Sequence, residues 1–404
     1  MGLVALSASA LRLRNAMDAN DFAVAQVLAK SAVEYGIQQV HGDNSWRTTF
    51  VHDIESQPMT LGQGTIAWKL VDDDGNLADD DSDSVRVVGI GRVGTVTVAE
   101  SVRLLASGEP LACLGSAFTC AGDINVKSAV QLMTNQQISS GGNISTGFLS
   151  SIQGNVEAAG TASGSIQGNI AQNVPARRMP GSSAFDYYLD NGTHIPLEAI
   201  PNVSGILLID RQVLSPQVNP YGELNREGIY IINCAGQQIC IKNSRILGTL
   251  VLLNPASNSA LEGALRWDAA VANYPALLVQ GSLQIKFVAS ALSESSLSTN
   301  FNPSSVPYGE QADSDLLGTY PSEINGLVYF SGQLDAPQDH IESPFRGVTV
   351  CQSINASSSA RFNYRPLLFE FPAPGFSSGN PMVICPRSRR RETVANTMDP
   401  NAAL

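Results

Sequence analysis

Residues Leu3–Val40 constrain the fold of this chain more than any other stretch, because they contain no proline and a single glycine, Gly36. Alanine and straight-chain residues dominate the stretch and favour helix. Apolar or small residues recur at helical spacing, namely Phe22, Ala25, Ala29, Ala32 or Val33, Gly36 and Val40. We therefore expect a long N-terminal helix within residues 1–42, with one face packed against a globular body.

The beginning of the predicted helix is wholly apolar or small. Leu3–Leu11 reads LVALSASAL, and the basic residues Arg12 and Arg14 follow it. This run is shorter than the roughly 20 residues of a membrane span, and no basic residue precedes it as in a signal peptide. We interpret residues 1–42 as a truncated membrane anchor with the body exported to the cell envelope. The alternative is an ordinary buried helix of a soluble protein.

The composition narrows the class of protein. Charged residues make up 15% of the chain, and its formal net charge is −12. Nucleic-acid binding depends on clustered lysine and arginine, so a general nucleic-acid surface is not expected. An oxidising location would allow disulfides among the six cysteines, and the absence of Cys-x-x-Cys argues against zinc-ribbon and thioredoxin-like sites. These cysteines are Cys113, Cys120, Cys234, Cys240, Cys351 and Cys385.

Three strands are expected after the helix, within residues 43–110. Gly64–Val71 alternates apolar and polar residues, and Val85–Arg92 and Thr95–Leu105 are rich in valine and leucine. Short connections favour an antiparallel meander, so we predict an α+β arrangement with the N-terminal helix lying on this sheet.

An acidic segment, Asp72–Asp83, separates the first two of these strands. It contains seven aspartates and Gly75, which permits a sharp bend. Carboxylate oxygens are the ligands that calcium prefers, and we name Asp72, Asp74, Asp79 and Asp81 as candidate calcium ligands. The glutamate that closes an EF-hand loop is missing. The alternative is a solvated acidic hairpin loop without a metal, and no other cofactor is expected.

Residues 111–175 are rich in glycine, serine and asparagine and contain an imperfect repeat. Its members are Gly122-Asp123-Ile124, Gly142-Asn143-Ile144, Gly154-Asn155-Val156 and Gly168-Asn169-Ile170. Short β-branched pieces separated by turn residues are typical of the coils of a parallel β-helix. We therefore predict β repeats here, although a flexible linker is the alternative.

The rest of the chain is also predicted to be mainly β. A connector with a short helix occupies residues 176–227, and strands resume in residues 228–370. The apolar runs Gly248–Leu253 and Pro275–Val279 are typical of parallel strands buried on both faces. We expect a parallel β-helix-like solenoid in residues 228–370, with an antiparallel sandwich as the alternative, and an irregular tail in residues 371–404.

The N-terminal residues also carry a family resemblance. Ser9–Arg14 and Ala23–Gly36 resemble the N-terminal helix of PilX-type pilus assembly proteins and of the helical minor pseudopilins of type II secretion. In those families an apolar anchor runs into a helix that ends in an Ala-x-x-Ala-Val-Glu-x-Gly-like stretch, here Ala29–Gly36. The prepilin cleavage pattern is absent, because Gly2 is followed at its spacing by Ser7 rather than glutamate. The resemblance implies a pilin-like meander and a place in the cell envelope.

A second resemblance covers most of the chain. Several segments are similar to a family of large, poorly characterised bacterial envelope proteins, which implies an envelope location but no activity. These segments are Asn44–Arg47, Asp74–Asp80, Phe185–Tyr188, Asn219–Gly222, Gly248–Asn254, Asn273–Val279 and Pro374–Phe376.

Motifs for catalysis are missing from the sequence. The histidines His41, His52, His194 and His340 are scattered, and Gly89–Gly94 lacks the dinucleotide-binding spacing and is interpreted as a turn. We predict a non-catalytic envelope or pilus-associated structural protein that contacts other envelope, pilus or secretion proteins, and the membrane through its helix. No nucleic-acid partner or small-molecule substrate is expected. The alternative is a β-helix polysaccharide lyase or hydrolase, with Asp186, Asp190, Asp210 and Arg211 as candidate catalytic residues.

Overall fold

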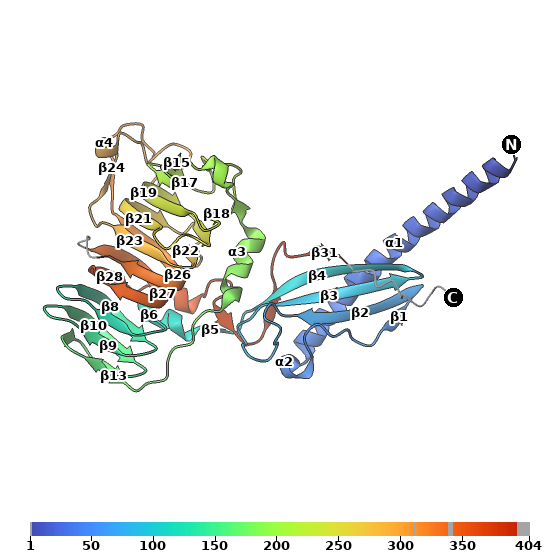
Figure 1. Cartoon of the computed structure of the whole chain (residues 1–404), viewed down its shortest axis with the longest axis horizontal. Helices are drawn as coiled ribbons and strands as arrows, with labels where there is room; N and C mark the ends of the chain where they lie inside the picture. The colour runs from blue at the N-terminus through green and yellow to red at the C-terminus, as the bar shows by residue number, and fades with distance from the viewer. Residues whose placement is uncertain (1, 310–311, 338–341, 394–404) are drawn as a thin grey trace. The chain divides into compact units, whose positions relative to one another are not determined.

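The computed structural model describes residues 2–309, 312–337 and 342–393, and for residues 2–16 it describes the backbone alone. These residues are mainly strand, with one long N-terminal helix. They fall into two compact units (Figure 1). Unit 1 combines Met1–Glu109 with Ser378–Leu404, and unit 2 is Pro110–Ser377.

Unit 1 is built from the N-terminal helix and an antiparallel sheet. The sheet order is β1-β2-β3-β4-β30, and β31 also pairs with β4. The elements are α1 (Gly2–Gly42), α2 (Trp46–Thr49), β1 (Met59–Leu61), β2 (Gly64–Val71), β3 (Val85–Val93), β4 (Val96–Ala106), β30 (Met382–Ile384) and β31 (Arg390–Glu392). The predicted antiparallel meander is therefore present.

The C-terminal part of the chain differs from the prediction of an irregular tail over residues 371–404. In the structure β30 and β31 add to the edge of β4, which local sequence cannot reveal because the partner lies almost 300 residues earlier. Residues 394–404 of the predicted tail lie outside the described residues.

One face of α1 packs on β2, β3 and β4. Its buried residues follow helical periodicity and are small or aliphatic, namely Ala25, Leu28, Ala29, Ala32, Val33, Ile37 and Val40. The predicted face is thus confirmed except at Phe22, which is 39% exposed. Figure 1 shows the helix extending well beyond the sheet on its N-terminal side. Within the described residues, no helix combines the length and hydropathy needed to cross a membrane.

Two glycines of β3 allow α1 to approach the sheet closely. A Cβ atom at Gly89 would lie 2.4 Å from the carbonyl oxygen of Ala29, and one at Gly91 would lie 2.2 Å from that of Ala25. The interpretation of Gly89–Gly94 as a turn is therefore wrong for Gly89 and Gly91, which lie within a strand. Only Gly94, with a φ of 55°, belongs to the turn into β4.

Unit 2 is a stack of parallel strands arranged in three ladders. Ladder A contains, in stacking order, β14 (Thr193–His194), β18 (Ile229–Asn233), β20 (Thr249–Leu253), β22 (Pro275–Gln280), β26 (Glu323–Ala336), β27 (Ser343–Ala356), β6 (Phe118–Cys120), β8 (Gln131–Ser140), β10 (Ser151–Ala158) and β13 (Ile170–Gln172). Ladder B contains β16 (Ile206–Asp210), β19 (Gln238–Leu247), β21 (Ala260–Asp268), β23 (Leu283–Phe287), β26, β27, β7 (Ile124–Val126), β9 (Ile144–Thr146) and β11 (Ala162–Ser163). Ladder C contains β17 (Val213–Leu214), β19, β21, β26, β27, β28 (Ala360–Asn363), β8, β10 and β12 (Ile166–Gln167). The predicted parallel pairing is present.

The stacking order does not follow the chain order. The strands of residues 118–172 come first in the sequence, yet they stack on β27 and β28 near the end of the unit. Residues 111–175 and 228–370, which the sequence analysis treats as two domains, therefore form one continuous stack.

Residues between the two parts of the stack run along the outer face of ladder A. This connector holds η2 (Ser182–Phe185) and α3 (Asp186–Asn191). The Tyr329 hydroxyl donates to the carbonyl oxygen of Pro180 at 2.9 Å, and the Phe185 and Tyr329 rings lie 5.7 Å apart. The connector therefore covers the outer face of β26 at Tyr329, which is 5% exposed.

The Gly-(Asp/Asn)-aliphatic repeat belongs to two different turns. Ile144 pairs with both Ile124 and Ala162, so the third member of the first turn is Gly160-Thr161-Ala162. Asp123 Oδ1 accepts from the Asn143 main-chain nitrogen at 2.6 Å, and Asn143 Oδ1 accepts from that of Thr161 at 2.9 Å. Val156 instead pairs with Ile170, so Gly154 and Gly168 belong to a second corner, where Gly154 lies at the bend of β10 between its pairings with β12 and β13.

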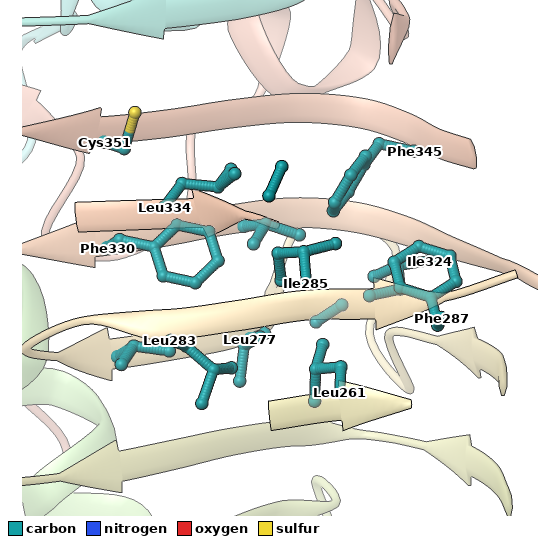
Figure 2. Close-up of a cluster of buried hydrophobic side chains, with 14 of the residues drawn as sticks. Leu261, Leu277, Leu283, Ile285, Phe287, Ile324, Phe330, Leu334, Phe345 and Cys351 are labelled. Atoms are coloured by element: carbon teal, nitrogen blue, oxygen red, sulfur yellow. The ribbon is translucent and has the colours of Figure 1, made fainter. Parts of the chain in front are cut away.

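Aliphatic and aromatic side chains fill the space between the ladders (Figure 2). Phe362 is 1% exposed, and its ring stacks on Phe345 at 5.4 Å and on Phe118 at 4.6 Å between centroids. This aromatic column crosses the junction at which residues from the two ends of unit 2 meet.

The remaining elements are short. They are β5 (Glu109–Pro110), η1 (Ala112–Gly115), η3 (Leu197–Ala199), β15 (Asn202–Val203), β24 (Leu292–Ser293), α4 (Glu294–Leu297), β25 (Thr319–Tyr320), α5 (Leu367–Glu370) and β29 (Ser377–Ser378).

Replacing Gly91 by alanine is expected to destabilise unit 1 by about 1–3 kcal/mol, because the added methyl group collides with the backbone of α1. Gly42→Ala is the matched control. Gly42 is the last residue of α1, and a Cβ atom there would meet no neighbouring atom within 4 Å. Denaturant unfolding followed by circular dichroism measures both variants. Equal effects of the two substitutions would contradict the close approach.

Phe362→Ala is expected to destabilise unit 2 by about 3–5 kcal/mol, because it leaves a cavity between Phe345 and Phe118. Phe148→Ala serves as the control, since Phe148 is 77% exposed and its removal should change the free energy of unfolding by less than about 0.5 kcal/mol. Chemical denaturation of the full chain separates the two outcomes.

Candidate functional site in the loop between β2 and β3

The acidic segment predicted from the sequence forms the loop that joins β2 to β3. Several of its side chains turn back on the main chain. Asp74 Oδ1 accepts from the nitrogen of Asn76 at 3.0 Å, Asn76 Oδ1 from that of Ala78 at 3.3 Å, and Asp80 Oδ1 from that of Ser82 at 2.7 Å. The loop is therefore folded on itself by successive Asx turns.

The structure brings together only part of the predicted ligand set. One carboxylate oxygen each from Asp72, Asp74 and Asp83 lie within 4.8 Å of one another. Asp79 and Asp81 are not members of this group. Asp83 is not among the ligands predicted from the sequence, although it is the twelfth residue counted from Asp72. Its position carries a carboxylate, but an aspartate where an EF-hand loop has glutamate.

Asp72 is the unusual member of this group, because its side chain is buried. The residue is 5% exposed, and its Oδ2 atom has no hydrogen-bond partner among the residues that the structure describes. Its Oδ1 atom lies 3.5 Å from the main-chain nitrogen of Asp74. Burial raises the pKa of the Asp72 carboxyl above its ordinary value, and the neighbouring charge of Asp74 adds to the rise.

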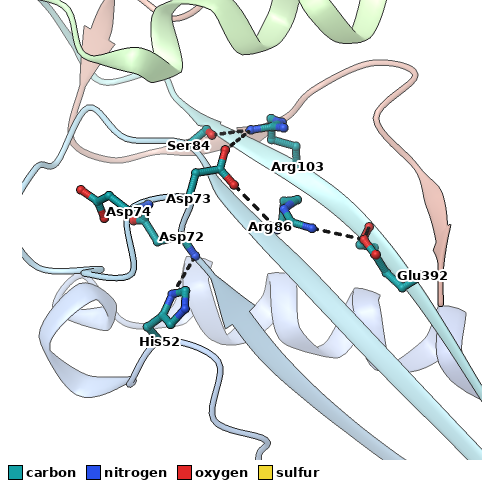
Figure 3. A network of polar contacts seen from close by, with 9 residues as sticks. His52, Asp72, Asp73, Asp74, Ser84, Arg86, Arg103 and Glu392 are labelled. Carbon is teal, nitrogen blue, oxygen red and sulfur yellow. Dashed lines mark hydrogen bonds and ion pairs between the residues drawn. The ribbon is translucent and has the colours of Figure 1, made fainter. Parts of the chain in front are cut away.

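Asp73 lies between these residues in sequence but contacts arginines of the sheet (Figure 3). Its carboxylate lies 3.7 Å from Arg86 and 3.4 Å from Arg103, and Arg86 also lies 3.4 Å from Glu392 of β31. On the other side, the main-chain nitrogen of Asp72 donates to His52 Nδ1 at 3.1 Å. The loop thus separates Asp73, which is paired with cations, from the group of Asp72, Asp74 and Asp83.

Arg47 of α2 braces the loop through main-chain atoms. It donates to the carbonyl oxygens of Leu77 at 3.1 Å and Asp83 at 2.6 Å. Burial lowers the pKa of Arg47 from its ordinary value, while the nearby aspartates oppose that shift. Its guanidinium also lies 4.4 Å from the centre of the Trp46 ring. A single side chain therefore holds the middle and the C-terminal end of the loop.

The residues considered for polysaccharide cleavage lie on two elements of unit 2. Asp186 and Asp190 belong to α3, whereas Asp210 ends β16 and Arg211 follows it. Asp210 Oδ2 lies 3.2 Å from Arg211, and its Oδ1 accepts from Asn243 at 3.2 Å. Asp210 and Arg211 therefore form an ion pair with each other at the end of β16.

The histidines and cysteines among the described residues do not form a cluster with one another in the acidic loop. His41 Nε2 lies 2.8 Å from the carbonyl oxygen of Met382, and His194 is exposed in β14, while His340 lies outside the described residues. The six cysteines are buried free thiols. Burial raises the pKa of Cys113, Cys234 and Cys240 to about 12 each, so these thiols stay protonated and unreactive at neutral pH.

Comparisons with known proteins find similarity in structure but not in sequence. No protein-family model and no curated protein sequence matches the chain. Among solved structures, the crystal structure of the competence-associated pilin ComZ from Thermus thermophilus matches with a TM-score of 0.36 and 10% identity, over 92% of this chain and 98% of that one. A score of this size does not establish a common fold.

Arg47→Ala is expected to loosen the loop between β2 and β3, because it removes two charge-assisted hydrogen bonds to main-chain oxygens, worth about 1.5–3 kcal/mol each. Limited proteolysis should then cut within residues 72–84 faster than in the unmodified protein. Arg92→Ala is the control, since Arg92 forms a partly exposed pair with Glu55 at 2.7 Å that contributes at most about 1 kcal/mol. Similar cleavage of both variants would show that Arg47 does not hold the loop.

Proposed function

We propose that this protein is a non-catalytic structural component of the cell envelope, associated with pilus or secretion proteins through protein–protein contacts. The observation that carries the proposal is the part of α1 that lies beyond its sheet. Met17, Asp18, Ala19 and Asn20 are exposed, and packing on the sheet begins near Ala25.

An unsupported helix of this kind needs a partner to be stable. Most helical stability in proteins comes from tertiary packing of an apolar face rather than from intrinsic propensity. The first turns of α1 carry the apolar sequence Leu3–Leu11, and residues 2–23 would extend over about 33 Å at the rise of an α-helix. A helix or apolar surface of another molecule would supply the missing packing.

The N-terminal resemblance supports the choice of partner class. PilX-type proteins and minor pseudopilins combine an apolar helical start with a helix-bearing sheet, and Ala29–Gly36 carries the similar stretch. The packing of α1 on the antiparallel sheet of unit 1 agrees with that expectation. The membrane anchor stays a prediction from the sequence.

In this proposal unit 2 is a solenoid that serves as a rigid body for display or assembly. Its ladders share a continuous apolar interior, while its turns carry polar ladders such as Asp123, Asn143 and Thr161. Stacked coils of this kind present long regular faces through which solenoids associate with partners.

A photocrosslinking residue at Met17 of the full chain tests the proposal in the native cell. Met17 is 58% exposed on the unsupported part of α1, and a probe at Phe148, which is 77% exposed in unit 2, is the control. The Met17 probe should capture an envelope, pilus or secretion protein in the envelope fraction, and the Phe148 probe should not capture that protein. Recovery of the protein without such a partner at Met17 would contradict the proposal.

Turnover assays test the non-catalytic part of the proposal. The purified full chain is expected to leave acidic polysaccharides intact, and Asp210→Asn should behave in the same way. Cleavage by the unmodified protein that is lost in Asp210→Asn or Arg211→Ala would overturn the structural role in favour of the polysaccharide-cleaving alternative.

A further inference from the structure

We propose that the loop between β2 and β3 is a calcium site, with Asp72, Asp74 and Asp83 as its carboxylate ligands. The site lies within unit 1 and is independent of the envelope role proposed above. Its support comes from the spacing of the three carboxylates and from the buried oxygen of Asp72.

The spacing of the three carboxylates fits a single ion. Calcium binds oxygen at about 2.3–2.6 Å, so two oxygens on the same ion are separated by no more than roughly 5 Å. The oxygens of Asp72, Asp74 and Asp83 all lie within 4.8 Å of one another. They occupy the first, third and twelfth places of a twelve-residue segment, which are places that carry ligands in EF-hand loops.

The buried side chain of Asp72 is a second observation that favours a bound cation, separate from the spacing of the carboxylates. A buried carboxylate oxygen without a donor is strongly disfavoured, because it has lost its hydration and gained nothing in return. The Asp72 Oδ2 atom is in this condition. Two basic residues near this loop bind main-chain atoms: His52 accepts from the Asp72 nitrogen, and Arg47 donates to the Leu77 and Asp83 oxygens. A bound cation would satisfy the orphaned oxygen.

A second acidic group in unit 2 shows why a cluster alone is insufficient. Glu294, Asp313 and Asp315 also lie within 4.8 Å of one another. However, buried Glu294 accepts from the Phe301 nitrogen at 2.6 Å, the Gly318 nitrogen at 2.9 Å and the Tyr320 hydroxyl at 2.9 Å. Those donors satisfy both oxygens, so that cluster has no demand for a cation.

The ligand chemistry favours calcium over other common metals. The group contains only carboxylate oxygens, whereas zinc sites are built mainly from cysteine and histidine. Magnesium requires near-ideal octahedral geometry and keeps several waters, while calcium accepts irregular sets of oxygens. Asn76 and Asp80 occupy the fifth and ninth places of the segment, which also carry ligands in EF-hand loops. Their side-chain oxygens accept hydrogen bonds from main-chain nitrogens of the same loop.

Calcium binding to the full chain is tested by isothermal titration and thermal unfolding at constant ionic strength. With about 5 mM calcium, the unfolding midpoint of unit 1 should rise by at least about 2 °C relative to EGTA. Asp72→Asn should abolish the heat of binding and the shift. In EGTA this variant should unfold no earlier than the unmodified protein, because it removes the unpaired buried charge.

Asp79→Asn is the matched control, because it removes the same charge from an exposed position of the same loop outside the group. It should keep the calcium-dependent shift. The proposal is overturned if the unmodified protein shows neither heat nor shift, or if Asp72→Asn retains both. Equal losses in Asp72→Asn and Asp79→Asn would also overturn it, since they would indicate diffuse charge attraction rather than a site.

Discussion

The parallel pairing of β27 with β6 is the interaction on which unit 2 depends. Thr349 pairs with Phe118 and Cys351 with Cys120, so strands from the beginning of the unit join the stack through one of its last long strands. A single coil cannot bury its own apolar side chains, and stability comes from its neighbours in the stack. The rings of Phe362 and Phe118 reinforce the same junction from inside. Without this junction, the strands of residues 118–172 would have no stack to join.

A different constraint governs unit 1, where the distance between helix and sheet is decisive. Gly89 and Gly91 carry no side chains, and they face Ala25 and Ala29 of α1. Small residues on both sides bring the two backbones close together, so van der Waals contact replaces the interdigitation of large side chains. The packing of α1 is correspondingly local and begins near Ala25.

Local patterns in the sequence predicted local structure well. The apolar face of α1 and the strands β2 to β4 follow from periodicity, and the acidic loop follows from its composition, since all of these depend on residues nearby in the chain. The stacking of residues 118–172 on β27 could not be predicted, because a coil pattern does not specify which coil lies next to it. The glycine repeat misled for a related reason, since Gly142 and Gly154 have similar neighbours but belong to different turns.

The candidate calcium ligands show the same division. Composition and turn residues located the loop and two of its ligands, Asp72 and Asp74. The role of Asp83 and the burial of Asp72 depend on how Arg47 and the strands around the loop fold it, which no local pattern contains. Asp79 and Asp81 are chemically equivalent to the ligands in the sequence, and only their position in space separates them.

The stacking order also bears on how unit 2 can change in length. The chain enters the unit near Leu111 and leaves it near Phe376, and the Leu111 nitrogen donates to the Phe376 carbonyl oxygen at 3.0 Å. Both ends of the stack, at β13 and at β14, are therefore remote from these connections in the order of the ladders. A strand added or removed at either end of the stack would leave the hydrogen bond between Leu111 and Phe376 unchanged. Such a body can grow in two directions during evolution without any change where it is anchored.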